Sequence, residues 1–216
     1  MTERRKRFER APKAAHCLTP LKVRALVLIA ESRFLSTPQV AGLMGISEHA
    51  VRGHLRDLYD MGLTNVVAIP GSAVGSKALI APKVHYPSAE GIKQLKQLAV
   101  LPDAALKPGG YSPEQFMFLG HELAVRDMLV YLTRLARENE GHEVERWDSS
   151  KGLQTDSVRP DAVFVYRYGE THMAGILEAD MGTERGTAGD RFDRWAQKAQ
   201  AYRTYLKSPL WGILWQ

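Results

Sequence analysis

The sequence has a single cysteine and no long apolar run, and both absences exclude classes of protein. Cys17 has no partner within the chain for a disulfide, which fits a reducing compartment. A membrane helix needs roughly 18 uninterrupted apolar residues, whereas the apolar segment LKVRALVLIA is interrupted by Lys22 and Arg24. We therefore expect a cytoplasmic protein that has no membrane segment and no signal peptide.

The net charge is +5 over 216 residues, and most of the excess lies in residues 1–17. This segment has no apolar periodicity, so we expect a flexible basic arm. Such an arm is either a solvated tail or a segment that follows phosphates or enters a minor groove. The candidate DNA contacts in it are Arg4, Arg5 and Arg7.

Three short helices are expected in the first half of the chain. In PLKVRALVLIAESRF the residues at helical spacing are Leu21, Ala25, Leu28 and Ile29. The second helix, in STPQVAGLMG, has Thr37 as its predicted N-cap and Pro38 at its first position. Ser47 is the predicted cap of the third, SEHAVRGHLRDLYDMGL. Two short helices joined by a tight turn are typical of a helix-turn-helix.

The third helix separates apolar and basic residues onto different stripes. Its expected inward residues are Val51, Leu55, Leu58 and Tyr59. His49, Arg52 and Arg56 fall on another stripe that should face outward. Arginine on an exposed helix can fork onto guanine in the major groove, although such a stripe is also compatible with an ordinary solvated face.

A strand, a Gly/Ser-rich loop, a second strand and a helix capped at Ser88 follow. This order resembles the winged-helix DNA-binding domains over residues 18–99. The resemblance implies binding of double-stranded DNA, with Lys77 and Lys83 in or beside the wing. The same fold used for protein contact or dimerisation is the alternative.

Residues 100–113 concentrate proline and glycine, so we place a linker there and a second domain at 114–216. Its expected order is helix, three strands, helix and a final apolar strand, LWGILWQ. That order predicts a mixed sheet with helices against it, an α+β or α/β domain. A chain that ends on a buried strand looks like a piece of a longer protein.

Acidic residues lie at the open end of a hairpin in RPDAVFVYRYGETHMAGILEAD, residues 159–180. A Gly169-Glu170 turn of type II′ pairs Tyr168 with Thr171, and this register places Asp161 opposite Glu178. Asp180 shares the same face as Glu178. Three converging carboxylates predict a Mg²⁺ or Mn²⁺ site. In the alternative, the acids end their strands at a solvated rim beside Arg159 or Arg185.

Pro160-Asp161 followed by Glu178-Ala179-Asp180 resembles the PD-(D/E)XK nuclease-like fold. The resemblance implies metal binding by Asp161, Glu178 and Asp180, with help from Glu122 on the preceding helix. Asp180 stands where an active nuclease normally has lysine, and Lys198 on the following helix is the candidate replacement. The candidate catalytic residues are therefore Asp161, Glu178, Asp180 and Lys198.

The segments HELAVRD, PDAVFVY and LEADMGTERG, behind a winged helix, resemble the replication-relaxation family of plasmids and integrative elements. The resemblance implies a DNA-binding protein acting in replication, mobilisation or DNA relaxation, beside a plasmid replication or transfer protein or as a homodimer. Two alternatives stay open: an active metal-dependent endonuclease or nickase, and a transcriptional regulator whose second domain mediates protein contacts.

Overall fold

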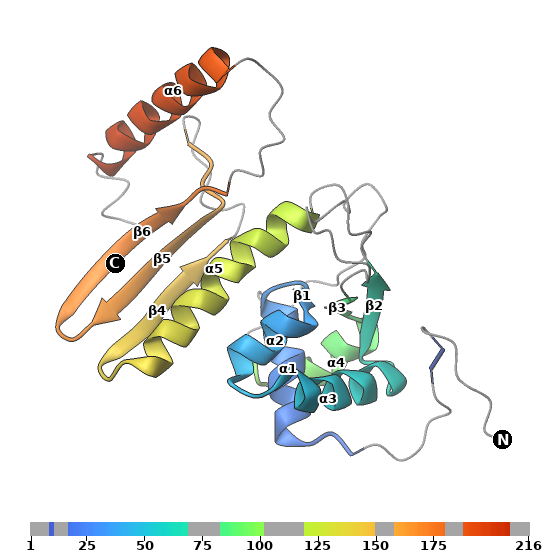
Figure 1. The fold of residues 1–216 in the computed structure, drawn as a ribbon. Helices are drawn as coiled ribbons and strands as arrows, with labels where there is room; N and C mark the ends of the chain where they lie inside the picture. The colour runs from blue at the N-terminus through green and yellow to red at the C-terminus, as the bar shows by residue number, and fades with distance from the viewer. Residues whose placement is uncertain are drawn as a thin grey trace. The chain divides into compact units, whose positions relative to one another are not determined.

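The computed structural model describes residues 9–10, 17–68, 83–101, 119–149, 158–179 and 188–207, without the side chains of 188–192 and 194. The chain forms two compact units, Met1–Glu138 and Asn139–Gln216. The elements of the first are α1 (Pro20–Glu31), β1 (Leu35–Ser36), α2 (Thr37–Met44), α3 (Glu48–Asp60), β2 (Thr64–Ala68), β3 (Lys83–Pro87), α4 (Ala89–Gln97) and α5 (Leu119–Glu138) (Figure 1).

Serine caps begin three of the helices in the first unit. The predicted caps at Ser47 and Ser88 are confirmed, since each hydroxyl accepts a hydrogen bond from a backbone N–H in the first turn. The predicted cap at Thr37 is wrong. Ser36 caps α2 instead, because it forms a capping box in which the Gln39 side chain accepts from the Ser36 N–H at 2.9 Å.

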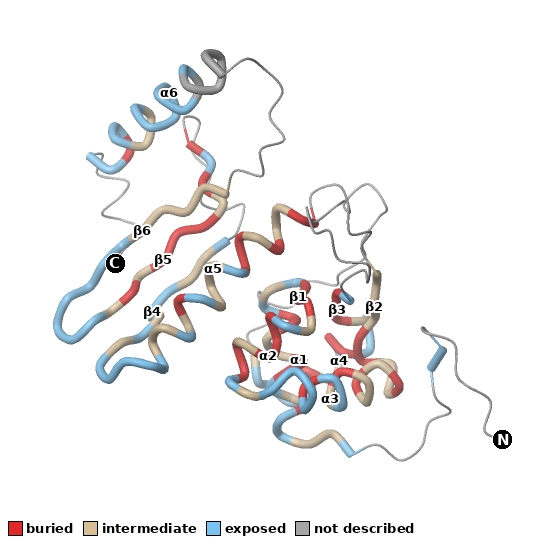
Figure 2. Tube along the Cα trace, viewed as in Figure 1, coloured by how far each residue is buried: buried red, intermediate tan, exposed pale blue. Residues whose placement is uncertain are grey.

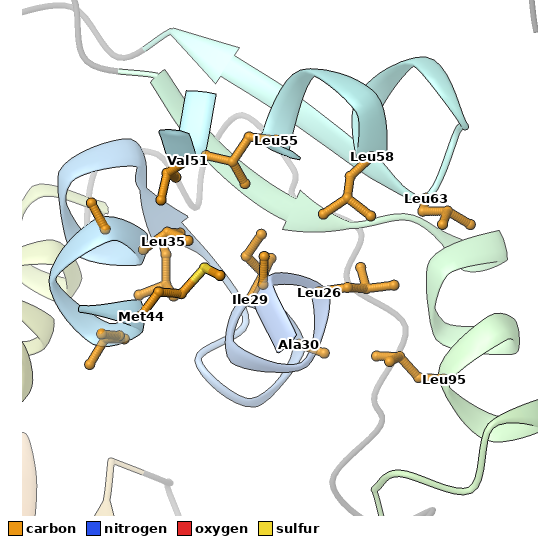
Figure 3. Packing of buried hydrophobic residues seen from close by; sticks show 14 of the residues in the cluster. Leu26, Ile29, Ala30, Leu35, Met44, Val51, Leu55, Leu58, Leu63 and Leu95 are labelled. Carbon is orange, nitrogen blue, oxygen red and sulfur yellow. The ribbon is translucent and has the colours of Figure 1, made fainter. Parts of the chain in front are cut away.

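The core of the first unit lies between α1, α2 and α3. Val51, Leu55 and Leu58 of α3 are buried, as predicted, and point toward Leu26 and Ile29 of α1 (Figure 3). Leu21 was expected on the buried face of α1 but is 44% exposed. Lys22 is buried in its place, donating to the Cys17 carbonyl at 2.8 Å and pairing with Asp57 at 2.7 Å.

A three-stranded antiparallel sheet with the order β1-β3-β2 closes the same unit. β2 and β3 agree with the two strands predicted after α3, whereas the two-residue β1 was not predicted. His85 of β3 pairs with Leu35 on one side and Val66 on the other. The central strand β3 is therefore hydrogen-bonded along both edges, and His85 is buried within the sheet.

α5 packs on α2 within the first unit, although the sequence placed this helix in the domain at 114–216. The contact is close, because a Cβ on Gly42 would lie 2.4 Å from a Val130 methyl carbon. The side chain of Gln39, which also takes part in the capping box of α2, donates to the Leu123 carbonyl at 2.8 Å and to the Asp127 carboxylate at 2.7 Å.

The second unit contains β4 (His142–Asp148), β5 (Ala162–Tyr168), β6 (Thr171–Leu177) and α6 (Ala188–Leu206). Its sheet has the order β4-β5-β6, and both pairings are antiparallel. The central strand β5 is the most buried of the three, while the first half of β6 is exposed (Figure 2). Gly175 of β6 lies against the Phe164 ring, so a side chain there would collide with it.

The α+β class is confirmed, with helices beside two small antiparallel sheets. The mixed sheet expected in the second unit is not seen among the described strands, since the strand that would complete it, LWGILWQ, lies outside the described residues. None of the helices in the described ranges has the length and apolar character that crossing a membrane requires.

Candidate functional site

The turn of the β5–β6 hairpin sets the predicted register. Gly169 has φ 61°, the left-handed value that glycine adopts without strain, whereas Glu170 does not have a positive φ. This pattern agrees with the type II′ turn. Tyr168 pairs with Thr171 and Ala162 with Leu177, so the predicted register is confirmed from the turn as far as Ala162.

Asp161 closes the open end of this hairpin. Its backbone N–H donates to the Leu177 carbonyl at 3.0 Å, just beyond the last pair of the ladder, Ala162 with Leu177. Its carboxylate accepts a hydrogen bond from the Ala179 N–H at 2.7 Å. Asp161 and Glu178 therefore meet at the same end of the sheet, and one role of the Asp161 carboxylate is to hold the end of β6.

Both carboxylate oxygens of Glu178 have a partner on α6. Lys198 approaches one oxygen at 2.5 Å, and the Tyr202 hydroxyl donates to the other. Glu178 is 13% exposed, so this ion pair is shielded more than a surface pair would be. The Lys198 ammonium also lies 5.4 Å from the centre of the Trp195 ring.

Helical spacing explains why α6 can make these contacts together. Trp195, Lys198 and Tyr202 follow one another at i, i+3 and i+7, which places them on one face of the helix. Burial raises the pKa of Tyr202, and its hydrogen bond to Glu178 and the charges of Glu178 and Asp161 raise it further. Tyr202 therefore stays protonated and acts as a hydrogen-bond donor.

A lysine ammonium thus lies where the sequence predicted a metal ion. Facing carboxylates need a cation between or beside them, and Lys198 supplies one to Glu178. Across the described ranges, no three His, Cys, Asp or Glu side chains gather in a metal-binding arrangement. Asp180, the third predicted ligand, lies outside the described residues. The described donors do not by themselves fit a divalent ion, and the Mg²⁺ or Mn²⁺ site stays a prediction.

Glu122, the fourth predicted metal ligand, has a different partner in the first unit. It pairs with Arg126 one helical turn later at 2.9 Å. Arg126 is 3% exposed and donates to the Ser32 carbonyl at 2.7 and 2.9 Å, while its guanidinium lies 4.3 Å from the Phe34 ring centre. Arg126 therefore fastens α5 to the segment between α1 and β1.

The basic residues predicted on α3 do not share one environment. His49 and Arg52 are exposed, and Arg52 pairs with Glu48, which is also exposed, at 3.1 Å. Arg56 is half-buried: it pairs with the buried Asp60 at 2.9 Å and donates to the Glu9 carbonyl at 2.6 Å. Arg56 therefore helps to hold the first unit together, although part of its side chain is exposed at the surface.

Of the remaining candidate DNA contacts, Lys83 is the one that lies among the described residues. Lys83 is exposed at the start of β3. Lys77 and the arm residues Arg4, Arg5 and Arg7 lie outside the described residues. Sequence reasoning gave no role to Arg10, which the structure places against β2. Its hydrogen-bond partners, Thr64 and Asn65, are more than fifty residues away in the sequence, so no local pattern could have identified it.

These observations define the class of the protein: an α+β chain with a basic helical unit and a second unit whose hairpin ends in a lysine-paired carboxylate. A sequence model of the replication-relaxation family matches residues 26–212. The chain belongs to this family, as the sequence motifs predicted, and the family indicates a role in the replication or relaxation of mobile elements. Comparison with curated proteins and with solved structures gives no match.

Proposed function

We propose that the protein binds double-stranded DNA through a winged helix formed by residues 18–99, in the replication or relaxation of a mobile element. The element order supports this, since α1, β1, α2, α3, β2 and β3 follow one another with the sheet order β1-β3-β2. In a winged helix α3 is the recognition helix. Residues 69–82, which join β2 to β3 at the position of the wing in such a domain, lie outside the described residues.

The surface of α3 carries the proposal. Its first two turns expose His49, Ala50, Arg52 and Gly53, while its opposite face is packed in the core. The N-terminal residues of a recognition helix are those that reach base edges. Arg52 is 66% exposed, and its ion-pair partner among the described residues is an exposed glutamate on the same helix, so a guanine edge or a phosphate can replace that partner at small cost.

Gly53 adds a second, independent reason. A Cβ built at this position has no atom within 4 Å, so packing within the unit does not require glycine there. Glycine in a helix interior costs roughly 1 kcal/mol relative to alanine. A helix surface that is low at Ala50 and Gly53, beside His49, allows close approach to the floor of a groove.

The test is fluorescence anisotropy of a labelled duplex titrated with the full chain over a series of salt concentrations. Arg52→Ala should weaken binding by about 5- to 150-fold, the equivalent of about 1–3 kcal/mol, if Arg52 reads a base. If Arg52 contacts phosphate, the variant should lower the slope of log K against log salt by about 1 for all sequences.

Lys93→Ala is the matched control. Lys93 is 64% exposed on α4 and has a glutamate partner one turn away on its own helix, as Arg52 does on α3. It should leave both affinity and salt slope almost unchanged. Equal effects of the two substitutions would show that only net charge matters, and the assignment of α3 as the recognition helix would fail.

Metal-dependent nicking of DNA is a second candidate function, favoured by one contact. Lys198 brings to the hairpin acids the cation that Asp180 does not supply. Because the described acids do not fit a divalent ion on their own, we assign no reaction step to them. Nicking of supercoiled DNA with Mg²⁺ or Mn²⁺ that Asp161→Ala abolishes would support this candidate, and no nicking with either ion would refute it.

A further inference from the structure

One side of α5 faces α2 and is fixed to it by several contacts. This side is formed at helical spacing by Asp127, Val130, Arg134 and Arg137. Asp127 accepts a hydrogen bond from Gln39, and Val130 packs against Gly42. Arg137 donates to the Gly42 and Leu43 carbonyls in the last turn of α2. Arg134, in contrast, is exposed and makes no hydrogen bond or ion pair with the described residues.

Arg134 lines a pocket of about 590 Å³ next to the start of the proposed recognition helix. Other residues of the lining are Gly45 and Ile46, between α2 and α3, and Ser47 and Glu48, where α3 begins. All of the lining belongs to the first unit. In a helix-turn-helix the helix before the recognition helix crosses the DNA backbone, while the first residues of the recognition helix reach base edges. Under the proposed function, the pocket therefore lies where a phosphate strand would pass.

The charges around the pocket determine where an anion can bind. Its acids are Asp127, which is hydrogen-bonded to α2, Glu48, which pairs with Arg52, and Glu138. These acids make the interior of the pocket unfavourable for a phosphate. Glu138 lies one helical turn after Arg134 but forms no ion pair with it. The favourable position for a phosphate is therefore the edge of the pocket, at the exposed guanidinium of Arg134.

Arg24 of α1 adds positive charge at the same end of α2. Burial, and then the charge of Arg24, lower the pKa of Arg137, so the two guanidinium groups lie close enough to repel each other. Arg24 is exposed and has no ion-pair partner among the described residues. Neighbouring charges of one sign are stabilised when an ion of the opposite sign binds beside them. The end of α2 is thus a region of the first unit to which an anion is attracted.

We propose that Arg134 of α5 binds a phosphate of the same duplex whose major groove receives α3. This inference rests on the proposed function, because it adds a contact to that duplex from a helix outside residues 18–99. The contacts of α5 with α2 hold Arg134 at a fixed place beside the start of α3. A phosphate contact positions a protein on the duplex without reading its sequence. Arg134 therefore contributes affinity and orientation, and α3 contributes the choice of site.

The experiment is titration of labelled duplexes with the full chain, followed by fluorescence anisotropy over a series of salt concentrations. One phosphate contact contributes about 0.9 to the slope of log K against log salt. Arg134→Ala should therefore weaken binding about eightfold at 0.1 M salt, and the loss should approach zero near 1 M. The effect should be the same for duplexes of unrelated sequence. Arg134→Lys keeps the charge and should keep most of the slope.

Two further variants serve as controls. Arg203→Ala removes another exposed arginine near the end of a helix that has no ion pair with the described residues, but Arg203 belongs to the second unit. This variant should leave the slope unchanged. Glu138→Gln removes the acid one turn from Arg134 and should strengthen binding, most of all at low salt, because a phosphate at Arg134 no longer meets its negative charge.

The outcomes separate this contact from the recognition helix. An unchanged slope in Arg134→Ala, an equal change in Arg203→Ala, or weaker binding by Glu138→Gln overturns the inference. Loss of binding in Arg52→Ala but not in Arg134→Ala overturns the inference and leaves the proposed function standing. Failure of the unaltered chain to bind duplex overturns both. Urea midpoints should be equal for all variants, and a lowered midpoint in Arg134→Ala without tighter binding by Glu138→Gln would assign Arg134 to stability instead.

Discussion

Protonation of His85 should destabilise the first unit as the solution becomes acidic. The imidazole is 5% exposed in the central strand β3, and one ring nitrogen lies 3.2 Å from the Thr37 hydroxyl. The other ring nitrogen has no hydrogen-bond partner among the described residues. Burial, and then the positive charge of Lys83, lower the pKa of His85 from 6.5 to about 4.

The direction of the effect follows from which state binds the proton more readily. The unfolded chain takes up a proton on His85 near pH 6.5, whereas the folded chain resists it until about pH 4. The contribution of neutral, buried His85 to the free energy of unfolding is therefore fully present above pH 6.5 and is lost as the pH falls from 6.5 to about 4. A difference of about 2.5 units at 1.36 kcal/mol each corresponds to about 3 kcal/mol.

His85→Gln is the perturbation, because glutamine can still hydrogen-bond to Thr37 but does not titrate. Urea unfolding followed by circular dichroism should show the unaltered protein losing about 3 kcal/mol more than the variant between pH 7 and pH 4. The tryptophans all lie at or after Trp147, in the second unit. Their fluorescence transition is therefore an internal control that the substitution should leave unchanged. Parallel pH dependences of the two proteins would show that His85 is not held neutral by the fold.

Two further predictions concern Lys198 and Gly53. Lys198→Ala should lower the melting temperature of the second unit, and added Mn²⁺ should partly restore it, because removing the ammonium leaves Glu178 without its cation. Lys207→Ala, at an exposed residue directly after the same helix, is the control, and an equal response to Mn²⁺ in both variants would refute this account. Gly53→Ala should raise the free energy of unfolding by about 0.5–1 kcal/mol, because the added Cβ meets nothing. Gly53→Gln should weaken duplex binding, and unchanged affinity would argue against close approach of α3 to DNA.

Local rules determined the parts of the fold that the sequence predicted correctly. The II′ turn at Gly169 fixes a register that holds as far as Ala162 and Leu177, which brings Asp161 and Glu178 to the same end of the hairpin. Serine caps at Ser47 and Ser88 mark helix starts because their hydroxyls satisfy backbone donors close in sequence. Each of these features depends either on residues within a few positions of one another or on regular strand pairing that continues from a turn.

Errors arose where two local solutions were nearly equivalent. Serine and threonine both cap helices well, so Ser36 and Thr37 were nearly equal candidates. Ser36 is the cap because Gln39, three residues later, completes a capping box with it. Leu21 was expected to be buried because it is apolar. Lys22 occupies the buried position instead, because its ammonium donates to the Cys17 carbonyl and pairs with Asp57 there. Burial of a lysine needs partners, and Asp57 is too distant in the sequence to be recognised beforehand.

Long-range contacts explain what the sequence did not reveal about the site. Lys198 was proposed as a substitute catalytic cation, but the structure pairs it with Glu178 across twenty residues of chain. Arg10 was counted in the charge of the arm, whereas its contacts with Thr64 and Asn65 depend on how α3 and β2 meet. In neither pairing are the two residues at a sequence spacing from which the contact could be predicted.

The charges of the two units support placing DNA affinity in the first. In the described part of the second unit, Arg167 is held by Glu143 at 2.5 Å and Glu145 at 3.0 Å, and Lys198 is held by Glu178. A phosphate would have to displace these carboxylates and would meet their negative charge. Arg52 has only an exposed partner one turn away, and an exposed pair of this kind is worth less than about 1 kcal/mol. Under the proposed function, we therefore expect binding energy from phosphates to be gained on α3 and the basic arm.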